Sequence, residues 1–476
     1  MCGMTLLGLR LLIEVLMRKK IVNLFLFVLF FCMAAGCFFA CSTPVQKLQL
    51  KEEETTEEDE VEEEEVEPDP KKLTLMIYMA ADNDLETYAL QNLKAMERAD
   101  YDFEAMNVLV LLDRAEGYDE TDGNWTDTRL FEVLKDSGQS SMIQSKRLEC
   151  LPLGLSLTDT TELDMANPNV LKMFIEFCRA EYEAENYCLI IWGHGTGWRG
   201  VTVDDRSGNY MSVCDMGKAL CNQNLCVIGF DTCFGGVLEN VYELKNCASY
   251  TVACPGVTPG GGWNYKDLLE LCLQEDSQQE ASLQESTALG FAKAMAQSSS
   301  VPVTIFKNEN LASFMRSFEA FSHALSETII TVSDKQTIFN RLFSLRSYSY
   351  SQYPCDMYLD IPSIAEFYSE DQNAAVAQAA VNLKNEFLET IIQMQGSEGG
   401  ASGTSGTTSS SSTSNTAGIG IHFIPMASAR TAMATHSSDY LKNTGRTDQC
   451  AFIKESQWWV PTISGNTGSL LDKLFY

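Results

Sequence analysis

Short apolar segments alternate with amphipathic segments along the first part of this chain, and that order limits the fold more than any other feature. The apolar segment 73–80 is typical of a buried strand, and Asn83, with Glu86 three residues later, has the spacing of a helix capping box. A second apolar segment, 106–112, follows this helix, and Asn167 before a proline is typical of a further helix start. Strands joined by helices of this length form βαβ units, so the pattern predicts an α/β fold with a mainly parallel central sheet.

The order of elements is less regular after residue 300. Helical patterns at 311–328 and 374–394 precede an apolar strand, GIGIHFIP. The segment 396–417, between the second helix and this strand, is rich in Gly, Ser and Thr, which is typical of a flexible loop. We therefore expect a main domain at 73–300 and a C-terminal α/β subdomain at 301–476.

Two of the apolar segments stop at chemically reactive residues. LIIW is followed by His194 and Gly195, and VIGF is followed by Asp231 and Cys233. Because the carboxyl ends of parallel strands meet at one edge of a sheet, these residues are expected to face one crevice. A cysteine reacts as its thiolate, which needs a nearby base or a positive field at neutral pH. The pattern predicts a cysteine hydrolase in which His194 is the base, Cys233 is the nucleophile, and the N–H groups of Gly195 and Cys233 hold the oxyanion.

The segment after Cys233 supports this choice, and so does a comparison with the other cysteine and histidine candidates. FGGVLEN follows Cys233 and is expected to open a helix whose N-terminus favours a thiolate. Cys254 also ends a strand-like segment, so it is the rival nucleophile or, alternatively, a core residue. The other three histidines, His323, His422 and His436, lack a glycine-rich strand end and are expected to be structural.

Asp231 is the candidate substrate-binding residue. A carboxylate that ends a buried strand is costly unless it is paired. Side chains alternate along a strand, so residues 231 and 233 are expected to open into one pocket, where a substrate guanidinium can bind the carboxylate in bidentate fashion. The alternative is that Asp231 or Thr232 caps the following helix. A carboxylate this close also raises the pKa of the thiol.

The chain is strongly acidic, with 476 residues and a formal charge of −31. The segment 51–72 contributes −10, and residues 73–476 carry −25. This charge argues against nucleic acid as a partner and favours cationic substrates.

Residues 1–40 have the pattern of an export signal. From Met17, which is an alternative start, MRKK precedes a long apolar run. Cys37 follows small residues, as in a bacterial lipobox, and Cys41 is the second candidate for lipidation; the alternative is a plain transmembrane anchor. The acidic segment 41–72 is expected to be a disordered tether. The body is therefore expected outside the cytoplasm, lipid-anchored to the bacterial cell envelope.

The sequence predicts no metal site. None of the cysteines forms a CxxC pair with metal-ligand spacing. Asp204 and Asp205 lack EF-hand spacing, so the sequence does not support a calcium site, and no cofactor is expected to be required. Disulfide pairing is left open.

Five segments together resemble the clostripain family of cysteine peptidases, and the resemblance covers most of residues 73–460. They are YMAADNDLE from Tyr78, IIWGHGTGW around His194, VIGFDTC up to Cys233, PGGGWNY around Trp263, and GIGIHF from Gly418. That family shares a caspase-like α/β fold, a three-layer sandwich, with legumains, gingipains and separase, so 73–300 would be the catalytic domain. The resemblance implies a His194–Cys233 dyad that cleaves peptide bonds after arginine or lysine, with Asp231 lining the primary specificity pocket.

The chain departs from the family's pattern at a few positions. Thr232 stands where alanine is usual, and Gly261 and Asn264 stand where relatives often carry aspartate. Relatives can mature by a cut between the histidine and cysteine segments, which here would follow Arg206; the alternative is an intact surface loop. Calcium dependence also occurs in some relatives.

Taken together, the sequence predicts an exported, lipid-anchored cysteine endopeptidase that acts on polypeptides with basic residues. Two alternatives are a catalytically silent surface binding protein with the same fold and a thiol amidase that acts on a small molecule.

Overall fold

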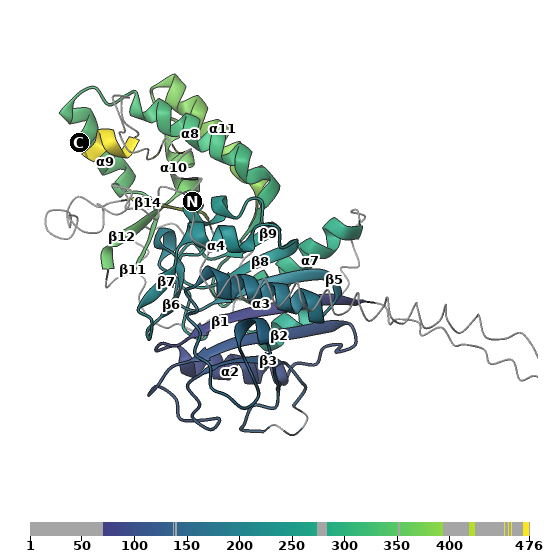
Figure 1. Ribbon diagram of the computed structural model, residues 1–476. Coiled ribbons are helices and arrows are strands. Elements are labelled where there is room, and N and C mark those ends of the chain that lie inside the picture. The colour runs from purple at the N-terminus through teal and green to yellow at the C-terminus, as the bar shows by residue number, and fades with distance from the viewer. Residues whose placement is uncertain are drawn as a thin grey trace, which may run out of the picture. The chain divides into compact units, whose positions relative to one another are not determined.

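The computed structural model describes residues 70–136, 138, 140–273, 283–350, 353–393, 418–423, 452, 456, 458 and 470–475 (Figure 1). They belong to one compact unit, Pro68–Tyr476. The predicted export signal, Cys37, Cys41, nearly all of the acidic segment, His436 and the segment 396–417 lie outside the described residues. Within the described part of the chain, no helix is long and apolar enough to cross a bilayer.

A sheet of nine described strands forms the centre of this unit. In spatial order the strands are β13 (Ile391–Gln393), β10 (Thr304–Lys307), β9 (Ala248–Ala253), β8 (Leu225–Asp231), β5 (Ala184–Trp192), β1 (Lys71–Ala81), β2 (Met106–Arg114), β3 (Thr128–Glu132) and β4 (Lys146–Leu148). The five strands from β9 to β2 are parallel, and the outer strands pair antiparallel. The predicted α/β fold with a parallel core is confirmed.

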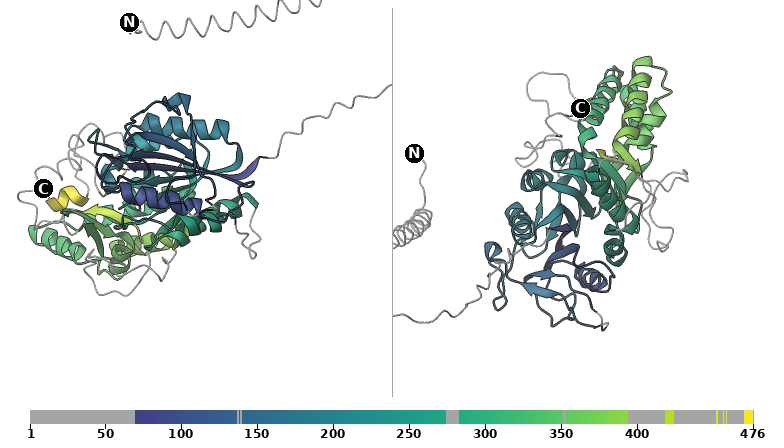
Figure 2. Two further views of the ribbon diagram at one scale, coloured as in Figure 1. Left: turned by 90° about the horizontal axis from the view of Figure 1, so that it is seen from below. Right: turned by 90° about the vertical axis from the view of Figure 1, so that its right-hand side faces the viewer.

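Helices cover both faces of this sheet, as the views in Figure 2 show. On one face lie α2 (Glu86–Glu97), α6 (Tyr265–Cys272) and α7 (Leu283–Ser298), and on the other lie α3 (Pro168–Glu181), α4 (Val213–Leu220) and α5 (Leu238–Glu243). Strand β1 shows why two cores form. Leu75 and Ile77 pack into the first core, whereas Met76 and Tyr78 pack into the second, because alternate strand residues face opposite sides. The result is a three-layer sandwich.

The C-terminal part adds a small antiparallel sheet and further helices. The strands of the small sheet are β11 (Ser347–Tyr350), β12 (Tyr353–Asp360) and β14 (Gly420–Phe423). The helices are α8 (Leu311–Ser326), α9 (Val332–Phe343), α10 (Ile361–Tyr368), α11 (Ala374–Thr390) and α14 (Leu470–Phe475). Val237, after β8, pairs with Gly420 in β14, and β10 and β13 extend the central sheet beyond residue 300. The domain boundary at residue 300 stays a prediction.

Two predicted helix starts turn out differently. Asn167 caps α3, as expected, and a proline follows it. The capping box at Asn83 is wrong, because α2 begins at Glu86 and the Asn83 side chain instead accepts the Leu85 N–H at 3.0 Å. The Glu86 carboxylate is engaged elsewhere, in a buried ion pair with Arg114. A tertiary contact therefore overrides the local spacing.

Candidate active site

The two reactive segments meet at the carboxyl edge of the sheet. Strands β5 and β8 are parallel neighbours, and Trp192 at the end of β5 pairs with Asp231 at the end of β8. A small pocket of about 60 Å³ opens here. It is lined by Leu85, Trp192, Gly193, His194, Asp231, Thr232, Cys233, Thr258, Pro259, Gly260 and Gly262. The expectation that His194, Asp231 and Cys233 face one crevice is confirmed.

The Cys233 thiol is partly buried at the wall of this pocket. Its Sγ accepts the Thr258 N–H at 3.4 Å and lies 3.5 Å from the Thr258 carbonyl oxygen, to which it can donate. Burial raises the pKa of the thiol, the Thr258 N–H opposes this rise, and Asp231 adds to it. The resting cysteine therefore favours the neutral thiol and depends on a base for ionisation.

The helix expected directly after Cys233 starts later. Helix α5 begins at Leu238, with Val237 as its N-cap, and Phe234 adopts a left-handed backbone with φ of +54° in the turn between. A six-residue helix that begins five positions away gives the thiolate no terminal field, because that field falls off within one turn. The alternative in which Asp231 or the next residue caps this helix is wrong for the same reason.

A residue that the sequence analysis missed holds the His194 ring. Its Nε2 lies 2.7 Å from Oδ1 of Asp84, in the turn between β1 and α2. The neighbouring Asn83 fixes this turn, because its side-chain amide donates to the carbonyls of Ala80 and Val203. The available signal was topological. Because β1 lies beside β5, residues that follow the two strands come together.

Glycines allow the His194 segment to approach its neighbours. A Cβ at Gly195 would collide with the carbonyl oxygen of Cys233, and a Cβ at Gly193, whose φ is +137°, would lie 2.8 Å from the Ala80 carbonyl oxygen. Gly195 also forms an antiparallel bridge with Val201, and the hydrogen bonds of this bridge belong to the flanking residues. In such a pair the Gly195 N–H points away from the partner.

Asp231 is almost completely buried. Its Oδ2 accepts the Trp263 N–H and the Tyr265 hydroxyl, each at 3.0 Å, whereas Oδ1 is buried without a hydrogen-bond partner. Burial raises the pKa of Asp231 to about 7, although the Trp263 N–H and the Tyr265 hydroxyl both lower it. The carboxylate is thus anchored through one oxygen, and its other oxygen is unsatisfied.

The glycine-rich turn before Trp263 shapes the space over Asp231. Gly262 has φ of +61°, and a Cβ there would collide with the Asp231 carboxylate. Asn264, where relatives often carry aspartate, caps α6 by accepting the Asp267 N–H. Gly262 therefore leaves room for the Asp231 carboxylate, and Asn264 adds no second acid to it.

The rival residues lie away from the pocket. Cys254 is buried, its sulfur accepts the Gly256 N–H, and burial raises the pKa of its thiol to about 12. His422 is buried in β14, where burial and then Arg199 hold its pKa well below the usual value, so it is neutral. His323 is exposed on α8. None of the three lines the pocket.

Arg206, the predicted self-cleavage residue, lies between β6 (Val201–Asp204) and β7 (Asn209–Met211). Its guanidinium pairs with the Glu162 carboxylate at 2.5 Å, and its backbone N–H donates to the Asp82 carboxylate at 3.1 Å. Cleavage after Arg206 stays a prediction.

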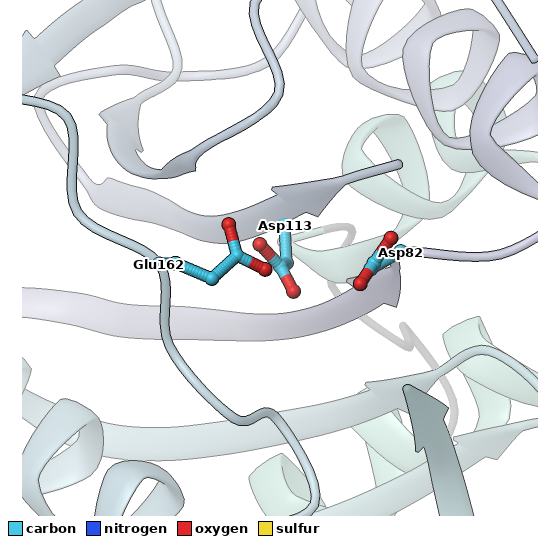
Figure 3. A group of neighbouring side chains, drawn as sticks. All are labelled: Asp82, Asp113 and Glu162. Carbon is cyan, nitrogen blue, oxygen red and sulfur yellow. The ribbon is translucent and has the colours of Figure 1, made fainter. Parts of the chain in front are cut away.

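One group of described residues has the composition of a cation site. Asp82, Asp113 and Glu162 each place a carboxylate oxygen within 4.8 Å of the others (Figure 3). The sequence analysis found no metal site because these acids come from three separate segments and share no motif.

Known proteins resemble this chain over most of its length. The model of the clostripain family matches residues 77–461. Clostripain of Hathewaya histolytica is 28% identical over 225 residues, which are 42% of this chain and 42% of that protein. The aligned region thus spans less than half of that relative.

Two solved structures share the fold. An inactive zymogen of a C11 protease from Parabacteroides distasonis has a TM-score of 0.55 at 20% identity, over 81% of this chain and 99% of that one. A secreted C11 cysteine protease from Bacteroides thetaiotaomicron, solved with an irreversible peptide inhibitor, has a TM-score of 0.51 at 17% identity, over 80% and 99%. The predicted caspase-like three-layer sandwich is thereby confirmed. Because the family model covers most of the chain, including both reactive segments, this protein belongs to the clostripain family of cysteine peptidases.

Proposed function

We propose that this protein is an exported cysteine endopeptidase that cleaves polypeptides after arginine or lysine, with His194 and Cys233 as its catalytic dyad. The observation that supports this most is Asp231, whose buried carboxylate has one unpartnered oxygen and lines the same pocket as the dyad. A substrate guanidinium or ammonium supplies the charge-assisted hydrogen bond that this oxygen lacks. The acidic body also attracts cationic peptides.

In the proposed reaction, His194 takes the proton from Cys233 Sγ, and the thiolate attacks the scissile carbonyl carbon. The oxyanion accepts hydrogen bonds from the N–H groups of Gly195 and Cys233. His194 then protonates the leaving amine, the C–N bond breaks, and the acyl group stays on the sulfur as a thioester. Water, activated by His194, hydrolyses the thioester and restores the thiol.

Asp84 has a positioning role in this proposal. Because Nε2 of His194 faces the Asp84 carboxylate, Nδ1 is the nitrogen left to receive the thiol proton. The carboxylate also stabilises the imidazolium that forms with the thiolate. This interaction offsets the burial and the Asp231 charge, which both favour the neutral thiol.

The proposal places the protein outside the cytoplasm, anchored by a lipid on Cys37 or, alternatively, Cys41. Its support is the lipobox-like sequence and the description of a structural relative as secreted. Mass spectrometry of the mature N-terminus tests the anchor: a diacylglyceryl group on Cys37 is expected, and an unmodified terminus would refute lipidation.

A fluorogenic peptide library that varies the residue before the scissile bond tests the function. For the wild type, kcat/KM is expected to be about 100-fold or more higher after arginine or lysine than after neutral residues. Asp231→Asn should remove most of this preference, because it deletes the charge but keeps the shape.

Alkylation of Cys233 by the neutral reagent iodoacetamide is the control for Asp231→Asn. Its rate should stay the same or rise in the variant, because removing the Asp231 charge lowers the pKa of the Cys233 thiol. Equal loss of labelling and cleavage would make Asp231 structural. Labelling without cleavage of any peptide would favour the silent binding protein, and hydrolysis of small amides alone would favour the amidase.

A further inference from the structure

We propose that Asp82, Asp113 and Glu162 bind one hard divalent cation of the calcium or magnesium class. We call these three side chains the carboxylate cluster. Asp82 follows β1, Asp113 lies near the end of β2, and Glu162 lies in the connection before α3. The cation binds without taking part in the peptidase chemistry at Cys233.

The geometry of the carboxylate cluster fits calcium. One oxygen from each side chain lies within 4.8 Å of the other two. Two ligands on opposite sides of a Ca²⁺ ion are separated by about 4.6–5.2 Å, since each bond is about 2.3–2.6 Å long. Figure 3 shows the carboxyl groups of Glu162 and Asp82 on either side of Asp113. All three oxygens therefore fit within one coordination sphere.

Asp113 supplies an observation that does not depend on counting acids. Its side chain is completely buried, and Oδ1 accepts the Thr128 hydroxyl at 2.7 Å. Oδ2 is buried without a hydrogen-bond partner. A buried carboxylate oxygen left unpaired is costly, whereas coordination to a cation satisfies it. The Asp113 carboxyl group lies between those of Glu162 and Asp82, so its unpartnered oxygen points to a positively charged ligand within this group.

The charge around the cluster supports the same ligand. Three carboxyl groups face one another here, and Asp204 is a further acid close enough to act on them. The Arg206 guanidinium, which pairs with Glu162, supplies one positive charge. One arginine does not balance these acids, and oxygen-only ligands select calcium or magnesium over softer metals.

Solvent has a route to the cluster. Glu162 and Arg206 also line an open cavity of about 390 Å³, together with Trp125 and Asp127. A cation can enter from this side and bind Glu162. Because Glu162 also holds the Arg206 guanidinium, the cation and Arg206 share this carboxylate.

Bound there, the cation would join the ends of β1 and β2 to the connection before α3. Asp82 is two residues from Asp84, which contacts His194. The cation would therefore stiffen the turn that positions the His194 ring.

Cation binding is tested on the full chain carrying Cys233→Ala, which prevents self-digestion and separates binding from catalysis. After chelator treatment, calcium and magnesium are titrated by calorimetry, and Tb³⁺ luminescence is excited through Trp125. One saturable site with a Kd of about 1 µM to 1 mM is expected for at least one of the two ions. The melting temperature should rise with its concentration.

The matched variants decide whether this binding belongs to the carboxylate cluster. Asp113→Asn with Glu162→Gln should weaken binding at least about 10-fold, whereas Glu120→Gln with Asp159→Asn removes the same charge from exposed positions and should leave it unchanged. Circular dichroism checks that both variants fold. No saturable binding up to 10 mM cation, or equal weakening in both pairs, would overturn the proposal.

Discussion

Two buried carboxylates at the same edge of the sheet, Asp231 on β8 and Asp113 on β2, have different surroundings. Each has one hydrogen-bonded oxygen and one buried oxygen without a partner. Asp231 shares its pocket with a thiol and an imidazole, whereas Asp113 faces two further acids. The ligand that suits an unsatisfied carboxylate oxygen therefore depends on the neighbouring groups. Beside the proposed nucleophile it suits a substrate cation, and among other carboxylates it suits a compact metal ion.

The strongest loss of activity is expected from a change in the Asp231 pocket that leaves Asp113 and its neighbours intact. Cys233→Ala removes the proposed nucleophile and should lower kcat/KM for an arginyl peptide by at least about 1000-fold. Cys254→Ala, the control, should change it less than about 3-fold, because that thiol lies outside the pocket. Steady-state kinetics measure both variants. Activity that survives in Cys233→Ala and disappears in Cys254→Ala would reverse the assignment.

An intermediate effect is expected at Asp84, which stands between the two carboxylate sites. Asp84→Ala should reduce kcat about 10- to 100-fold with little change in KM, because the substrate still binds but the His194 ring loses its partner. Asp84→Asn, which keeps a hydrogen-bonding oxygen, should recover part of this loss. A change confined to KM, or equal losses in the two variants, would contradict the positioning role.

A weaker effect is expected on the free energy of unfolding, and it distinguishes Asp231 from Asp113. Burial raises the pKa of Asp231 from 3.8 to about 7, so the folded state favours the protonated acid. The stability that the protonated Asp231 contributes is fully present below its pKa in the unfolded chain and is lost as the pH rises through its folded-state pKa of about 7. Asp231→Asn should therefore be more stable than the wild type at pH 8, on the order of 1–4 kcal/mol, and the gain should shrink towards pH 5.

Chemical denaturation at the two pH values measures this difference. The gain should be the same with and without calcium, whereas Asp113→Asn should lose the stabilisation that calcium gives. A pH-independent difference for Asp231→Asn would show that another group titrates.

The parts of the molecule that the sequence predicted are those encoded locally. The segments that form β5 and β8 are recognisable as apolar runs followed closely by His194 and Cys233, and neighbouring parallel strands bring such ends together. Asp84 was missed because its relation to His194 depends on β1 lying beside β5, which no local pattern states. The helix after Cys233 was expected too early because a turn, in which Phe234 adopts a left-handed backbone, separates Cys233 from the helix start at Leu238.

The carboxylate cluster, in contrast, could not be predicted from any local pattern in the sequence. Asp82, Asp113 and Glu162 have no common spacing, and each is ordinary in its own segment. Only the parallel pairing of β1 with β2, and the path of the connection before α3, make them neighbours. Such a site follows from the assembled topology and has no signature in the linear sequence.

The bridge between Val237 and Gly420 has a consequence for the timing of activity. The turn that carries Cys233 is tied to β14 through Gly236, whose carbonyl accepts the Gly420 N–H. Glu239 in α5 likewise accepts the His422 N–H, across 183 residues. Contacts this distant in the chain form late, because a long loop must close first. A chain still emerging during synthesis lacks this support, so we expect it to be inert until β14 has formed.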